Sequence, residues 1–194
     1  MPEESRRVLK GLDPRNPLVI DTRELGRRPG SMRKLSRVVQ APAQLGVEVI
    51  GVPEGSELQL DLRLESVVEG VLVTGTATAQ AAGECVRCLE PLQRELHAGF
   101  QELYVYPDSE GADDGETLRL EGDLIDLEPV VRDAVVLALP LAPVCRDECR
   151  GLCPECGIRL DADPGHRHEA VDPRWAALAG YRSELDQNEE KQES

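Results

Sequence analysis

A strict alternation of leucines with polar residues limits what this chain can fold into. Between Glu57 and Glu65 every second residue is leucine, and the residues between them are Gln, Asp and Arg. These leucines are Leu58, Leu60, Leu62 and Leu64. Side chains of a β-strand alternate between two faces, so the pattern predicts a strand with one buried and one exposed face.

Two more strands are predicted directly after this one. Gly70 marks a turn, and Val71–Ala82 is rich in Val and Thr, with Gly75 as an expected bulge. The stretch Gln93–Tyr106 alternates again. Three consecutive strands with short connections predict an antiparallel sheet, a meander or a partly closed barrel.

A helix is predicted over Leu127–Leu139. Asp126 can cap its start, Pro129 fits the first turn and Pro140 ends it. Apolar residues recur at helical spacing and also fill the other side, so we expect its neighbours to cover this helix nearly all round. The predicted fold class is α+β, an antiparallel sheet packed on one main helix, followed by a small Cys/His zinc-binding C-terminal region.

Charge is spread unevenly along the chain. The whole sequence has a net charge of −15, but residues 1–40 hold ten basic groups against five acids, which leaves −20 for the rest. We predict that residues 1–40 form a basic arm with one short strand, Leu18–Asp21, and that residues 41–140 form the sheet and helix.

The remaining parts complete the predicted organisation. Residues 141–182 are expected to hold the zinc-binding segment and a short helix capped by Asp172. Residues 183–194 are polar and are expected to be a disordered tail. We treat residues 41–182 as one structural domain.

The charge also limits the partners. The acidic part of the chain after residue 40 repels a phosphate backbone, so nucleic acid is expected to bind through the basic residues 1–40 or through a protein intermediary. With one Trp, one Phe and three Tyr, the chain lacks the rings of an RNA-stacking sheet. Alternatively, the acidic charge serves only to keep the protein soluble and says nothing about its partners. The candidate phosphate contacts are Arg27, Arg28, Arg33, Lys34 and Arg37.

The sequence shows no membrane or export signal. Residues 1–20 lack the apolar stretch of a signal peptide, and the longest uncharged apolar run, Ala134–Cys145, contains two prolines. We therefore expect a cytoplasmic protein. Thiols stay reduced there, so its six cysteines are expected to be metal ligands rather than disulfides.

Cysteines and histidines occur in four closely spaced pairs. One to three residues separate the members of each pair, which lets two side chains reach one tetrahedral zinc ion. The eight candidate ligands are Cys85, Cys88, Cys145, Cys149, Cys153, Cys156, His166 and His168.

Several ligand groupings are open at this point. We favour one local site made by the last four ligands, while the first four clamp the sheet to the segment after the helix. One alternative joins Cys85 and Cys88 to Cys153 and Cys156, and another leaves one site with spare thiols. Buried thiols or a redox pair are further alternatives for Cys85 and Cys88. In both complete groupings protein fills every position, so we expect one or two structural zinc ions.

Three motifs together resemble the YceD family, the large ribosomal RNA subunit accumulation proteins. They are residues 83–91 (GECVRCLEP), residues 126–143 with their ALPLAP ending, and residues 149–157 (CRGLCPECG). The stretch 172–178 is similar to the actinobacterial branch. Other members often carry Cys-x-Cys where this chain has His166 and His168.

The resemblance implies a role in the synthesis, processing or stability of 23S ribosomal RNA, and it carries no catalytic residues. We expect a non-enzymatic factor of large-subunit biogenesis that binds precursor ribosomal RNA, a basic large-subunit ribosomal protein, or both. Neither a membrane nor a small-molecule substrate is expected. The alternative is an enzyme, either a thiol oxidoreductase that uses Cys85 and Cys88 or a zinc-dependent hydrolase, although the sequence shows no nucleophile and base motif.

Overall fold

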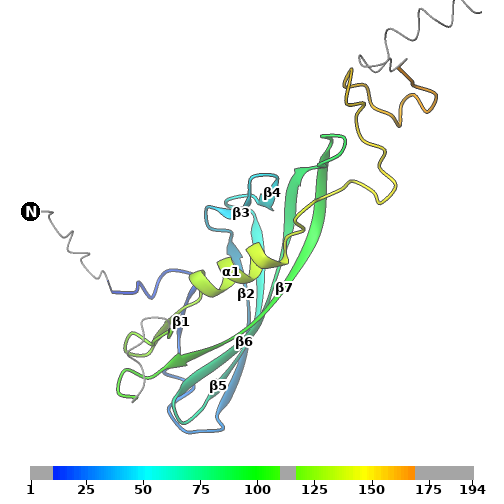
Figure 1. The fold of residues 1–194 in the computed structure, drawn as a ribbon. Helices are drawn as coiled ribbons and strands as arrows, with labels where there is room; N and C mark the ends of the chain where they lie inside the picture. Colours follow the sequence, from blue (N-terminus) through cyan, green and yellow to red (C-terminus); the bar gives the residue numbers. More distant parts are fainter. Residues whose placement is uncertain (1–10, 110–116, 169–194) are drawn as a thin grey trace, which may run out of the picture. The chain divides into compact units, whose positions relative to one another are not determined.

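The computed structural model describes residues 11–109 and 117–168 (Figure 1). Two compact units follow one another along the chain, Met1–Cys149 and Arg150–Ser194. The predicted helix after Asp172 and the predicted tail lie outside the described residues. No helix of the described part is long and apolar enough to cross a membrane.

A six-stranded antiparallel sheet forms most of the first unit (Figure 1). Strand β6 pairs with β7 along one edge. Along its other edge it pairs with β5 and then, further along, with β4. Strand β2 pairs with β5, and β3 pairs with β4. The strands are β2 (Met32–Gln40), β3 (Leu45–Val47), β4 (Ile50–Val52), β5 (Glu57–Ser66), β6 (Gly70–Glu84) and β7 (Pro91–Val105).

The predicted meander is confirmed. Strands β5, β6 and β7 pair antiparallel in sequence order, from Leu58 opposite Ala79 to Glu84 opposite Pro91. All four leucines of β5 are buried, as their alternation requires. The expectation of a partly closed barrel was wrong, because the sheet is open. Its leucine face joins one core with residues of α1, β1 and β8, so burial does not require closure.

Strand β2 was not predicted from the sequence, in which residues 32–40 were expected to belong to the basic arm. The whole stretch pairs with β5, from Met32 opposite Glu65 to Gln40 opposite Glu57. Its inward positions alternate arginine with Leu35 and Val39. Only half of that face is apolar, so the period-2 signal is weak.

Gly75 makes no bulge, contrary to expectation. The pairing of β6 runs through it without interruption, opposite Leu62 on one side and Phe100 on the other. A Cβ at Gly75 would lie 2.5 Å from Phe100 Cζ and 2.7 Å from Leu62 Cδ2. The glycine therefore provides the space that the Phe100 ring occupies.

A two-stranded ribbon and one helix complete the described part of the first unit. Strand β1 (Val19–Asp21), which the sequence predicted, pairs antiparallel with β8 (Leu124–Asp126). Helix α1 (Glu128–Ala138) follows, and Asp126 Oδ1 accepts the backbone N–H of Glu128 at 3.0 Å. Asp126 therefore caps the first turn, although the N-cap residue itself is Leu127.

The helix is less covered than the sequence suggested. Val130, Val131 and Val135 are buried, but Leu137 is 85% exposed. The expectation that its neighbours cover α1 nearly all round was therefore wrong. One side of α1 packs on β7, β6 and β3, and Leu137 is left exposed among the residues that the structure describes.

Candidate metal centres

The first cysteine pair lies in the turn between β6 and β7. The backbone N–H of Cys85 donates to the carbonyl of Glu90 at 2.8 Å, and the N–H of Leu89 donates to the carbonyl of Cys85 at 2.9 Å. These bonds close a tight loop that brings Cys85 and Cys88 to the same side. Leu89 has φ 58°, a left-handed conformation that costs a leucine roughly 1–2 kcal/mol.

The third cysteine pair uses the same backbone turn. Cys153 N–H donates to the carbonyl of Ile158 at 2.8 Å, and Gly157 N–H donates to that of Cys153 at 2.9 Å. Gly157 has φ 74°. In both turns the residue after the second cysteine is left-handed, and a Cys-x-x-Cys turn of this kind can direct two sulfurs at one ion.

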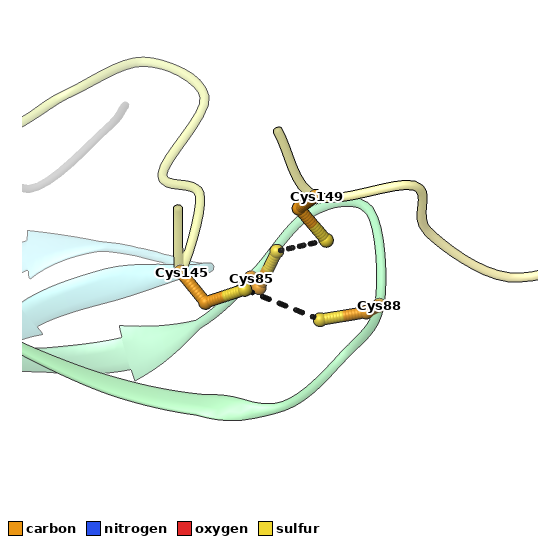
Figure 2. A group of neighbouring side chains, drawn as sticks. All are labelled: Cys85, Cys88, Cys145 and Cys149. Carbon is orange, nitrogen blue, oxygen red and sulfur yellow. Dashed lines mark hydrogen bonds between the residues drawn. The ribbon is translucent and has the colours of Figure 1, made fainter. Parts of the chain in front are cut away.

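Four cysteines meet at the end of the sheet (Figure 2). Cys85 and Cys88 come from the β6–β7 turn, and Cys145 and Cys149 come from the segment after α1. Every pair of sulfurs lies within 4.8 Å, with Cys85 Sγ 3.9 Å from Cys149 Sγ and Cys88 Sγ 3.7 Å from Cys145 Sγ. Tetrahedral zinc–thiolate bonds place neighbouring sulfurs about 3.8 Å apart, so this donor set fits zinc.

Hydrogen bonds to main-chain carbonyls hold the segment after α1 against the turn. Val86 N–H donates to the carbonyl of Pro143 at 2.9 Å. The Arg87 guanidinium donates to the carbonyls of Asp147 and Cys149, both at 3.1 Å. Cys145 is exposed, whereas the other three cysteines of this group are buried.

The thiols of Cys85 and Cys145 in the four-cysteine group differ in pKa. Burial raises the pKa of Cys85, but the backbone N–H groups of Cys145, Cys88 and Arg87 lower it more strongly, to about 6. Although Cys145 as a residue is exposed, desolvation of its sulfur within the group, followed by hydrogen bonding to the neighbouring thiols, raises its pKa to about 12. One thiolate is therefore stabilised by the protein itself, and further thiolates need a cation to balance their repulsion.

The second group joins two cysteines and two histidines. Cys156 Sγ lies 3.2 Å from the Nε2 atoms of both His166 and His168, and those two nitrogens are 2.8 Å apart. Cys153 Sγ completes a group whose donor atoms all lie within 4.8 Å of one another. Backbone N–H groups of Cys156 and Glu155 lower the pKa of Cys153 to about 6, against the opposing effect of burial.

The outer nitrogens of both histidines face carboxylates. His168 Nδ1 lies 3.2 Å from Glu155 Oε2, and His166 Nδ1 lies 3.9 Å from Asp163 Oδ2. Metal-bound histidines commonly direct one nitrogen to the ion and the other to a carboxylate. Neither acid was predicted from the sequence, although the place of Glu155 inside the Cys153–Cys156 turn indicates that its carboxylate can reach the ligand group.

The two groups are those that the spacing favoured. Each lies within one compact unit, and the grouping of Cys85 and Cys88 with Cys153 and Cys156 does not correspond to them. Both could hold a metal ion. That they bind zinc stays a prediction.

The five predicted phosphate contacts are not gathered in one patch. Arg27 lies 3.6 Å from Asp108 and 3.8 Å from Asp123, and its guanidinium lies over the Tyr106 ring. Its basic group is thus engaged within the protein.

The basic residues of β2 lie on different faces. Arg33 pairs with Glu24 at 3.0 Å, and Arg37 donates to the carbonyls of Pro17 and Val19. Lys34 is exposed on the opposite face of β2, and Arg28 is exposed before the strand. Their contact with RNA stays a prediction.

Comparison with known proteins gives the chain its family. The family model described as large ribosomal RNA subunit accumulation protein YceD matches residues 73–181, from β6 through both ligand groups. The chain belongs to the YceD family. No solved structure matches this YceD chain.

Relatives of this YceD chain occur in bacteria and plants. It is 51% identical over 166 residues to an uncharacterised protein of Mycobacterium tuberculosis (strain H37Rv), covering 84% of this chain and 80% of the relative. An uncharacterised Mycobacterium leprae protein is 42% identical over 84% of this chain and 76% of its own length. A maize protein named large ribosomal RNA subunit accumulation protein YCED homolog 1, chloroplastic, is 24% identical over 71% of this chain and 52% of its length.

Proposed function

We propose that this YceD protein is a non-catalytic, zinc-stabilised factor of large ribosomal subunit biogenesis in the cytoplasm. The family match carries the proposal, because it spans most of β6, all of β7 and α1, and both ligand groups in one stretch. The name of the maize relative ties that protein to accumulation of large-subunit ribosomal RNA. We extend this role to the present chain.

Zinc has a structural role in this proposal. Bound zinc would supply a cross-link and balance the charge of the thiolates. In the first group, Cys145 and Cys149 attach the segment after α1 to the β6–β7 turn. In the second group, the two histidines return to the Cys153–Cys156 turn. Four protein donors at each ion leave no position for a substrate, which favours a structural role over a catalytic one.

A redox role for Cys85 and Cys88 is the weaker proposal. The low pKa of Cys85 is a property of reactive thiols, but its side chain is fully buried. A reactive cysteine needs access to its partner, whereas a zinc ligand does not. The second pair of cysteines beside it favours metal binding.

The charge distribution favours a basic protein as the main partner. Outside residues 1–40 the chain has a net charge of −20, which repels RNA and attracts basic ribosomal proteins. Three of the five candidate phosphate contacts already interact with groups of the protein itself. We therefore propose firm binding to a basic large-subunit protein, with a weaker contact to precursor RNA.

Capture of the full-length chain from cells tests this function. The tagged protein is recovered before and after ribonuclease treatment, and large-subunit proteins, small-subunit proteins and 23S precursors are quantified. We expect enrichment of one or a few large-subunit proteins that survives ribonuclease, together with a smaller amount of 23S precursor. Equal recovery of proteins from both ribosomal subunits would contradict the proposal.

A further inference from the structure

The outward side of α1 carries apolar residues that the described part of the first unit leaves exposed. Leu137 is 85% exposed, and Leu141, just after the helix, is 97% exposed. The outward side of a surface helix normally carries polar residues, so two exposed leucines four positions apart single out this end of α1 as a surface for interaction.

Two grooves run along the sides of this helix. The groove between α1 and β7 measures about 370 Å³, and the groove between α1 and β3 measures about 730 Å³. Asp133 and Leu137 line both, so they form the ridge between the grooves. The partly exposed Phe100 and Leu118 add apolar surface to the first groove.

The charge of this surface is negative. Glu102 and Asp133 are the charged residues that line the α1–β7 groove. Arg132 lines the other groove, but it pairs with Glu128 at 2.7 Å and donates to the carbonyls of Ala43 and Gln44. Its positive charge is therefore satisfied inside the protein, and the acids define the charge offered to a partner.

We propose that the grooves on both sides of α1 bind a basic segment of a partner protein, with an apolar side chain of that segment against Leu137. Lysine or arginine residues of the segment would face Glu102 and Asp133. This inference rests on the proposed function only in taking the partner to be a basic ribosomal protein.

Charge favours this occupant over a second copy of the chain or an RNA. Each copy has a net charge of −15, and a symmetric contact through this face would bring the same two acids of both copies together. The phosphates of an RNA would meet the same acids. A basic segment instead gains from both the acids and the exposed leucine.

Binding of defined peptides tests the inference. Fluorescent overlapping peptides that cover the large-subunit ribosomal proteins of the same genome are titrated with the full-length chain, and anisotropy is measured at several salt concentrations. We expect Leu137→Ser to weaken binding of the best basic peptide about tenfold or more, because it removes a large apolar contact. The double variant Glu102→Gln and Asp133→Asn is expected to weaken binding and reduce its salt dependence.

Val68→Ser is the matched control. Val68 is 81% exposed and lies in the β5–β6 turn, outside both grooves. Because Leu137 and Val68 are both exposed, neither change removes a core contact, and we expect the control to bind as the parent chain does. Equal weakening by both variants would overturn the inference.

Two further outcomes separate this inference from the proposed function. If ribosomal proteins are captured from cells but Leu137→Ser does not reduce that capture, the inference fails and the proposed function stands. A dimer in analytical ultracentrifugation that Leu137→Ser abolishes would make the occupant a second copy and also overturn the inference. Failure of both the capture and the peptide binding would overturn the two proposals together.

Discussion

Leu89 and Gly157 occupy the same position in two matching turns. Each follows the second cysteine of a Cys-x-x-Cys pair, and each donates its backbone N–H to the first cysteine's carbonyl at 2.9 Å. Their φ angles are 58° and 74°. Only glycine adopts this conformation without strain, so the leucine shows that the turn is imposed by its surroundings, to which a bound ion would contribute.

Replacing Leu89 tests that strain. Because a Cβ is the source of the penalty, Leu89→Gly should be more stable than Leu89→Ala by about 1 kcal/mol. Both variants remove the same exposed side chain, so the alanine variant is the matched control. Urea denaturation of the two proteins measures the difference. Equal stability would show that the turn relaxes without cost.

Replacing Gly75 tests the packing of β6 against its neighbours. Gly75→Ala should lower the free energy of unfolding by roughly 1–3 kcal/mol, because the new Cβ meets Phe100 and Leu62. Gly99→Ala is the control, since a Cβ there meets no atom within 4 Å. Thermal or urea denaturation compares the variants. Equal effects of the two substitutions would be evidence against the register described for β6 and β7.

Tyr104 gives the fold a pH dependence with a defined sign. Its hydroxyl donates to the carbonyl of Asp126 at 2.7 Å, and burial, followed by the charges of Asp126 and Glu102, raises its pKa above the ordinary 10.0. At pH 7, Tyr104→Phe should cost about 1 kcal/mol, because a hydrogen bond is lost.

The difference between the two proteins should shrink at high pH. Above pH 10 the unfolded parent gains stability by ionising Tyr104, while the folded parent keeps it neutral. The phenylalanine variant lacks this effect. Urea denaturation of both proteins between pH 7 and pH 11 measures the gap. A gap that widens with pH would contradict the assignment.

Direct RNA contact is best tested by substitution. Deleting residues 1–40 would remove β2 and disturb the sheet, whereas Arg28 and Lys34 are exposed and can be neutralised. The double change to glutamine should weaken RNA binding and lower the slope of log affinity against log salt by about 1.5, since two phosphate contacts are lost. Filter binding at several salt concentrations measures this, and an unchanged slope would place the RNA contact elsewhere.

The sequence predicted those parts of the fold in which one simple pattern dominates. The leucines of β5 and the paired cysteines and histidines fall into this class. Strand β2 was missed because arginines take half of its inward positions and bond to Glu24 and to backbone carbonyls. In β2, polar contacts with distant residues therefore stand where an apolar side chain would have indicated a buried face.

Other features depended on distant parts of the chain. The role of Gly75 depends on where the Phe100 ring lies, and the sequence shows only that a strand contains a glycine. The exposed side of α1 was expected to belong to the core, because the sequence alone does not distinguish an apolar side chain that the fold buries from one that a partner buries. The sequence did not predict that the two Cys-x-x-Cys turns share one conformation, because leucine rarely adopts the left-handed conformation that Leu89 has.

Metal content of the full-length chain tests the central claim most directly. Native mass spectrometry should show two zinc ions per chain. Cys88→Ser combined with Cys145→Ser should lose one ion, because both residues belong to the first group, whereas Cys88→Ser combined with Cys156→Ser should lose both. Folded parent protein without metal, or loss of a single ion in the Cys88 and Cys156 double variant, would contradict the account.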